Sequence, residues 1–200
     1  MERPIVENTI ANVLKLHPKG SVLFVDDFLD FGNSESIKKA LLRLKEKEIL
    51  IRMAHGIYLY PKIDKELGVL FPSTEDIAKA IARRDKARIV PTGVNALNKL
   101  GLSTQVPMKV VYLTDGAARS IKIGKRTITF KNTSPKNLLA QGEISSLIIQ
   151  ALKAIGQSKV DDETLLKIQI LLKKEKIENI MNDAKLAPAW INKLLKQAIS

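Results

Sequence analysis

The sequence predicts a mostly helical α+β protein in which short β-ribbons interrupt a series of amphipathic helices. Apolar residues recur at helical spacing after Ser34 and again through most of the chain after Ile144. Residues 120–123 and 127–130 alternate around Gly124-Lys125, which is typical of a β-hairpin. An apolar fraction of 45% supports a hydrophobic core.

The N-terminal part predicts the order helix, short strand, helix, helix, strand, strand. Ser34 is expected to cap the longest of these helices, whose buried stripe contains Ile37, Leu41 and Leu44. Ala54-His55-Gly56 is the expected turn of the ribbon, because glycine takes a positive φ at little cost. This order is that of a winged helix-turn-helix. The expected elements are helices over 5–16, 26–29 and from Ser34, and strands over 22–24, 49–53 and 57–60.

Residues 63–72 are the expected linker, because Pro72 and Gly68 interrupt a stretch without a clean period. We therefore predict a winged helix-turn-helix DNA-binding domain over residues 1–62 and a C-terminal α+β domain with a small antiparallel sheet over residues 73–200. The elements expected in the second domain are helices over 73–84, 94–100, 144–155, 161–174, 177–181 and 190–199, and strands over 89–90, 110–113, 120–123 and 127–130.

Positive charge is concentrated in the middle of the chain. The net charge is +12, and residues 79–136 hold 13 basic residues against only Asp85 and Asp115. Such a field favours a polyanion or an acidic partner, although lysine-rich surfaces also simply increase solubility. The absence of cysteine excludes disulfides and thiolate metal sites and suits a cytoplasmic protein. No apolar run has the length of a membrane span or of a signal-peptide core, so we expect no membrane partner.

The helix that begins near Ser34 is the expected DNA-reading helix. Its polar face would place Arg43 against a guanine edge or a phosphate and Lys39 against a phosphate. Against this, Glu35 and Glu46 would be repelled by phosphate, and the same face can be read as an ordinary solvated helix face. Leu42 also falls on the polar side and would face the first helix or a dimer partner. The residues expected to contact DNA are Ser34, Ser36, Lys38, Lys39, Arg43, Arg52 and His55.

A second basic surface is expected in and around the hairpin of the C-terminal domain. One interpretation is an edge strand protected from aggregation by charge, and the other is a contact surface for nucleic acid or a partner protein. Its residues are Arg119, Lys122, Lys125, Arg126 and Lys131. Arg83 and Arg84 lie where a helix C-terminus favours cations, and this structural explanation is sufficient for them.

Catalytic signatures are absent from the sequence. Neither His17 nor His55 has a histidine or glutamate at metal-binding spacing, and there is no phosphate-binding glycine loop or nucleophile elbow. Asp161-Asp162-Glu163 lies where acidic residues stabilise a helix start. We therefore expect no enzymatic activity, no cofactor and no metal.

One segment resembles a known family. It runs from Pro91 to Pro107 as PTGVNALNKLGLSTQVP, and HGIYLYP stands at residues 55–61. Together with the expected winged helix, these residues resemble the AbiEi-type antitoxins of type IV toxin–antitoxin (abortive infection) systems, over roughly residues 5–155. For Ser103-Thr104-Gln105 the residues themselves give only a structural role, the satisfaction of backbone groups in a turn.

The resemblance implies an antitoxin with two activities. Its winged helix would bind the promoter DNA of its own operon and act as a repressor, and its C-terminal domain would counteract a nucleotidyltransferase-like toxin, with or without a stable complex. The alternatives are a winged-helix transcription regulator whose C-terminal domain dimerises or senses a ligand, and a protein-interaction module that has lost DNA binding.

Overall fold

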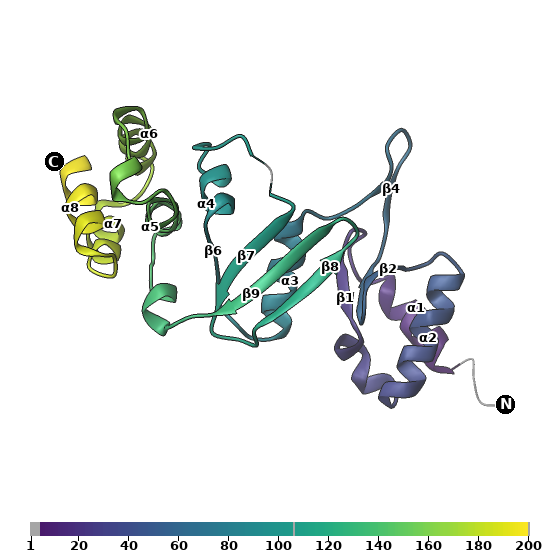
Figure 1. The fold of residues 1–200 in the computed structure, drawn as a ribbon. Coiled ribbons are helices and arrows are strands. Elements are labelled where there is room, and N and C mark those ends of the chain that lie inside the picture. The colour runs from purple at the N-terminus through teal and green to yellow at the C-terminus, as the bar shows by residue number, and fades with distance from the viewer. Residues whose placement is uncertain (1–4, 106, 200) are drawn as a thin grey trace. The chain divides into compact units, whose positions relative to one another are not determined.

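The computed structural model describes residues 5–105 and 107–199 and shows a mixed α+β fold. The chain forms two compact units, Met1–Ala80 and Ile81–Ser200, here called the N-terminal and C-terminal units. Each has its own elements (Figure 1). Among the described residues, no helix combines the length and the apolar composition that crossing a bilayer requires.

The N-terminal unit is built from helices, a three-stranded antiparallel sheet and a separate ribbon. The sheet order is β1-β3-β2, and Val22 on β1 pairs with Leu59 on β3. The elements are α1 (Ile5–Leu14), β1 (Val22–Phe24), the 3-10 helix η1 (Val25–Phe31), α2 (Ser34–Glu46), β2 (Ile51–Ala54), β3 (Ile57–Leu59), β4 (Lys62–Asp64) and β5 (Gly68–Leu70). The next helix, α3 (Thr74–Arg84), contains the boundary between the two units in the chain.

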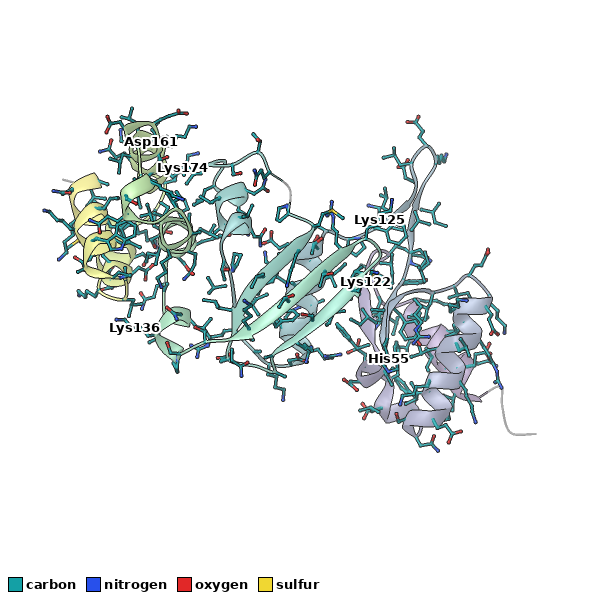
Figure 2. All side chains as sticks on the ribbon, in the orientation of Figure 1. His55, Lys122, Lys125, Lys136, Asp161 and Lys174 are labelled. Atoms are coloured by element: carbon teal, nitrogen blue, oxygen red, sulfur yellow. The ribbon has the colours of Figure 1, made fainter. Side chains whose placement is uncertain are left out.

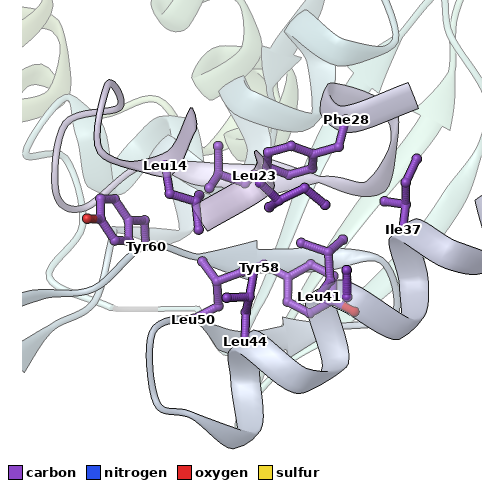
Figure 3. Packing of buried hydrophobic residues seen from close by; sticks show 11 residues of the cluster. Leu14, Leu23, Phe28, Ile37, Leu41, Leu44, Leu50, Tyr58 and Tyr60 are labelled. Carbon is purple, nitrogen blue, oxygen red and sulfur yellow. The ribbon is translucent and has the colours of Figure 1, made fainter. Parts of the chain in front are cut away.

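Every element predicted for residues 1–62 has a counterpart. The third element is a 3-10 helix that buries Phe28, rather than an α-helix over 26–29. The first helix ends at Leu14, two residues earlier than expected, which leaves Leu16 exposed. A common core holds these elements together: Leu14, Leu23, Leu41 and Tyr58 all belong to it (Figure 3).

The expected linker is structured. Residues 62–64 and 68–70 form the antiparallel ribbon β4–β5, and the Asp64 carboxylate accepts hydrogen bonds from the amides of Glu66 and Leu67 in its turn. Both backbone hydrogen bonds to the carboxylate lower the pKa of Asp64. The sequence signal was weak here because Ile63 and Leu67 are both exposed, so the ribbon has no buried face and no alternating pattern.

The C-terminal unit joins a four-stranded sheet to a helical bundle. The sheet order is β6-β7-β9-β8. A small antiparallel sheet was expected, but only two of its three pairings are antiparallel, and β7 runs parallel to β9. The elements are β6 (Ile89–Pro91), α4 (Val94–Lys99), β7 (Lys109–Thr114), β8 (Arg119–Ile123), β9 (Arg126–Asn132), η2 (Pro135–Leu138), α5 (Glu143–Ile155), η3 (Gln157–Lys159), α6 (Asp162–Leu172), α7 (Ile177–Ala184) and α8 (Ala189–Ala198).

Helix α5 is the central helix of the bundle, and two distant carboxylates cap its start. Gly142 at the N-cap has no side chain, so the first amides need other acceptors. Asp183 on α7 is fully buried and accepts hydrogen bonds from the amides of Gln141 and Gly142 and from the Ser145 hydroxyl. A Cβ on Gly142 would lie 2.3 Å from the Ser145 Oγ, so only glycine fits between the caps.

Glu175 is the second cap of α5. Burial opposes its charge, but hydrogen bonds from the Asn179 amide group and from the backbone amides of Ile144, Lys176 and Ser145 together lower its pKa. The carboxylate is therefore ionised at neutral pH, and its charge complements the helix dipole. Capping from α7 and the residues before it ties the first and third helices of the bundle together.

Replacing Asp183 by alanine should cost about 3 kcal/mol of folding free energy, because it removes the acceptor of the buried Gly142 amide, of the part-buried Gln141 amide and of the buried Ser145 hydroxyl. Urea denaturation followed by the fluorescence of Trp190, the single tryptophan, measures this. Glu178→Ala removes an exposed acid from the same helix and is the matched control, expected within about 0.5 kcal/mol of the wild type. Equal effects of the two substitutions would contradict the capping role.

Candidate nucleic-acid interface

The N-cap of helix α2 is one residue earlier than the sequence predicted. Asn33, not Ser34, is the N-cap: its side-chain oxygen accepts a hydrogen bond from the Ser36 amide at 2.8 Å. The Ser36 hydroxyl in turn donates to the Asn33 carbonyl, so Ser36 is half-buried in the cap. Ser34 is exposed in the first turn. Asparagine and serine are both good caps, and sequence alone did not decide between neighbours.

The outer face of α2 carries the exposed cations. Ile37, Leu41 and Leu44 are buried, whereas Lys38 and Lys39 are exposed. The Lys39 ammonium lies 2.5 Å from a carboxylate oxygen of Glu35, one turn earlier. That hydrogen bond and the charge of Lys39 lower the pKa of Glu35. Leu42 is 44% exposed on this side. The pair is fully solvated, so Lys39 can exchange Glu35 for a phosphate at little cost.

Arg43 differs from the lysines because a buried carboxylate holds it. Glu7 of α1 is only 8% exposed, and its two oxygens face Arg43 Nη1 at 3.7 Å and Lys47 Nζ at 2.5 Å. Arg43 is half-buried, whereas Lys47 is exposed. The arginine that was expected to read a base therefore also neutralises a carboxylate between α1 and α2.

Sequence reasoning missed Glu7, although a signal was present. Glu7, Ile10 and Leu14 fall on one helix face, and all three are buried. A glutamate on the apolar face of an amphipathic helix requires a cation on the facing element. Beside this contact lies a cavity of about 240 Å³, lined by Val6, Glu7, Asn33, Glu35, Ser36, Lys39, Ala40 and Arg43.

The turn between β2 and β3 joins the other two expected DNA contacts. Arg52 and His55 are exposed, and Arg52 Nη2 lies 3.2 Å from His55 Nδ1. The Arg52 guanidinium is a donor only, so it forms a hydrogen bond here with the His55 tautomer whose Nδ1 carries no proton. Gly56 closes the turn with φ of +68°. The guanidinium and the imidazole thus form one short polar tip.

The strand register places the residues of the second basic surface on two opposite faces of the sheet. Residues paired directly across strands share a face, so Lys122 on β8, Thr127 on β9 and Lys109 on β7 form one row. Lys131 projects from the same face of β9, and all three lysines are exposed. We call Lys109, Lys122 and Lys131 the lysine face. Lys109 was missed because only the parallel β7–β9 pairing brings it there.

Arg119 is on the other side of this sheet. It pairs with Phe130, and its guanidinium lies 5.7 Å from the centre of the Phe130 ring and contacts the Asp85 carboxylate. Arg119 therefore has a structural role and does not join the lysine face. Lys125 and Arg126 are exposed at and beside the β8–β9 turn, near the lysine face in the chain (Figure 2 labels Lys122 and Lys125).

The two acids of the basic segment are both held by arginines. Asp85 accepts from Arg84 at 2.9 Å as well as from Arg119. Asp115 binds the side chain and the backbone amide of Arg88, and these bonds lower the pKa of Asp115. The charges of Arg84, Arg88 and Arg119 are therefore used within the structure, whereas the charges of the exposed lysines are available to a partner.

The segment from Pro91 to Pro107 forms a helix and a pinned loop. The Asn98 side-chain amide on α4 donates to the carbonyls of Ser103 and Gln105, at 3.3 and 3.1 Å. The Ser103 hydroxyl accepts from the Gln105 amide, which agrees with the expected structural role. Val106 lies outside the described residues. Among the residues that the structure describes, no three histidine, aspartate or glutamate side chains gather as a metal site would require.

Comparison with known proteins identifies a family and a similarity to a solved structure. The model of a family of unknown function, DUF6088, matches residues 9–180. A crystal structure of the RV2827C protein from Mycobacterium tuberculosis is similar over 98% of this chain and 82% of that chain, with 13% sequence identity and a TM-score of 0.47. A similarity at that TM-score carries no argument about fold or function. No curated protein matches the sequence.

Removing both cations that face Glu7 should destabilise the N-terminal unit. Arg43→Ala with Lys47→Ala should cost about 3 kcal/mol, because the pair of substitutions leaves a buried carboxylate without a cation. The same double substitution in a Glu7→Gln background should cost clearly less, since no charge remains to be neutralised. Thermal denaturation of the four proteins measures the coupling, and equal costs in both backgrounds would contradict it.

Proposed function

The chain belongs to DUF6088, a family of unknown function. From the residues of the chain itself we propose that it is a DNA-binding antitoxin of the type IV class. In this proposal the N-terminal unit binds the promoter of its own operon and represses it. The C-terminal unit counteracts a nucleotidyltransferase-like toxin. The protein acts without enzymatic activity or a cofactor, in the cytoplasm.

The arrangement of residues 5–59 is the observation that supports DNA binding most strongly. A helix, a strand, a short helix, a second long helix and a two-stranded ribbon follow one another, and all pack on one core. We propose that this is a winged helix-turn-helix with α2 as the recognition helix and the Ala54–Gly56 turn as the wing. Lys38 and Lys39 then face the duplex, because Ile37 and Leu41 face the core.

The individual contacts follow from what holds each side chain. Lys38 and Lys39 are exposed ammonium groups, suited to phosphates. Ser34 lies in the first turn of α2, where the helix dipole favours a phosphate. Arg52 and His55 form the tip of the wing and would contact the flanking backbone together. Arg43 serves mainly to neutralise Glu7, so its loss would disturb DNA binding indirectly.

The lysine face supports the second activity. It presents three ammonium groups on an exposed sheet surface together with the hydroxyls of Ser120 and Thr127. The aromatic residues Tyr112 and Phe130 lie in the other face of the sheet, where they stack on each other. A surface rich in ammonium and hydroxyl groups but without aromatic rings suits phosphates or carboxylates rather than stacked bases. We propose that it meets either the toxin or the toxin's nucleic-acid substrate.

A transcription regulator whose C-terminal unit dimerises or senses a ligand is the second candidate. The observation that favours it is a groove of about 520 Å³ in the C-terminal bundle, lined partly by Leu165, Trp190 and Leu194. The two candidates differ in one respect: only the antitoxin restores growth against a toxin.

Lys38→Ala with Lys39→Ala should weaken binding to duplex DNA from the upstream region about ten-fold at moderate salt. The slope of log affinity against log salt should also fall by about one to two, because two phosphate contacts no longer release counterions. Fluorescence anisotropy over a salt series measures both. Lys15→Ala, an exposed lysine just after α1, is the matched control and should change neither. An unchanged slope in the double variant would rule out α2 as the duplex-facing helix.

Co-expression with a nucleotidyltransferase-like toxin from the same operon should restore growth. Replacing Lys109, Lys122 and Lys131 together by alanine should reduce the rescue while leaving promoter binding within about two-fold, since these residues lie outside the N-terminal unit. Lys159→Ala, Lys176→Ala and Lys185→Ala together, at three exposed lysines elsewhere in the C-terminal unit, are the control for total charge. Growth arrest that even the wild-type protein does not relieve would favour the transcription regulator instead.

A further inference from the structure

Helix α6 carries apolar residues on two opposite faces. Ile168 and Leu172 are buried in the bundle core. Leu166 and Ile170, one turn apart, point the other way and are 60% and 59% exposed. A helix on the surface of a bundle needs only one apolar stripe to hold its place. The second stripe therefore has no function in packing this helix within its own chain.

Charges are ordered along this outer stripe. Asp162 and Glu163 are exposed at its N-terminal end, and Lys173 and Lys174 are exposed at its C-terminal end. At 100° per residue, all four lie within a quarter-turn of the line through Leu166 and Ile170. From one end to the other the stripe holds acid, leucine, isoleucine and base, and Lys167 and Gln169 lie at its two edges. The Lys167 ammonium lies 2.7 Å from a carboxylate oxygen of Glu163 in the same chain. Figure 2 labels Asp161, just before this helix, and Lys174, just after it.

We propose that this stripe binds the same stripe on a second copy of the chain, with the two α6 helices antiparallel. In a two-fold interface, residue i meets j while j meets i. Leu166 then faces Ile170 of the second copy, and Asp162 and Glu163 face its Lys173 and Lys174. A parallel arrangement would bring like charges together, so the charge order selects the antiparallel one. The surface is complementary to itself.

The groove beside α6 extends the apolar part of this surface. Leu165 of α6 forms one wall, and Trp190 and Leu194 of α8 form the other, in a groove of about 520 Å³. Leu165 is about 100° around the helix from Leu166, so the groove lies to one side of the stripe. Aromatic and aliphatic residues in a recess beside a charged rim are typical of the energetic centre of an interface. The dimer covers α6 and this groove and requires no DNA.

Sedimentation of the full chain without DNA tests the dimer, over protein concentrations from about 1 to 200 µM. We expect a monomer–dimer equilibrium whose dissociation constant rises at least about ten-fold in Leu166→Glu. Leu139→Glu, at a leucine that is also exposed in the C-terminal unit, is the matched control and should leave the equilibrium unchanged. A monomer at every concentration, or a dimer equally sensitive to both substitutions, overturns the proposal.

Cysteine pairing tests the antiparallel register, because the natural chain has no cysteine. A mixture of Leu166→Cys and Ile170→Cys proteins should form a mixed disulfide at least about ten-fold faster than either protein pairs with itself, since the two-fold axis brings each residue to the other. Trp190 fluorescence of each variant confirms folding. Faster pairing of either single variant with itself overturns the antiparallel arrangement.

Discussion

A buried carboxylate between two helices reinforces how the N-terminal unit presents its charge. Glu7 is placed in the core face of α1, where an unpaired charge would be unstable. Arg43 and Lys47, on two successive turns of α2, form ion pairs with it. The buried stripe of Ile37, Leu41 and Leu44 sets the rotation of α2 about its own axis and turns Lys38 and Lys39 outward. The contact with Glu7 reinforces that orientation from the neighbouring face.

The C-terminal unit uses the same device for a different purpose. Asp183 and Glu175 cap α5 from residues more than thirty positions away, and Asp85 and Asp115 hold the arginines near the sheet. In each case a carboxylate accepts hydrogen bonds from a group that is distant in the sequence. Acids are few in the basic segment and all of them are engaged, so the lysine face keeps its positive potential. Because these acids are used within the structure, they do not neutralise the lysines of this face.

The sequence predicted the helices and strands more accurately than the contacts between their side chains. The amphipathic period of α2 and the glycine turns at Gly56 and Gly124 are local signals, and the corresponding helix and ribbons are present. The parallel pairing of β7 with β9 is non-local and has no signature in either strand, so Lys109 was missed. The sequence also grouped Arg119 with lysines that lie on the opposite face of the sheet. Arg43 was assigned to DNA without its partner Glu7, because the pairing depends on how α1 crosses α2. The periodicity of apolar residues predicts which face of a helix or strand is buried, but it does not predict which residues contact a ligand.

The parallel pairing also has a kinetic consequence. Strands β8 and β9 are joined by a turn of two residues, so their ribbon can close within microseconds. Strand β7 precedes β8 in the chain, and it must pass this ribbon to reach the inner edge of β9. Loop closure makes that step slower than the ribbon itself. We therefore expect the ribbon to form first, at the tight turn of Gly124, and the slower assembly of β7 and then β6 on it to limit the rate at which this sheet folds.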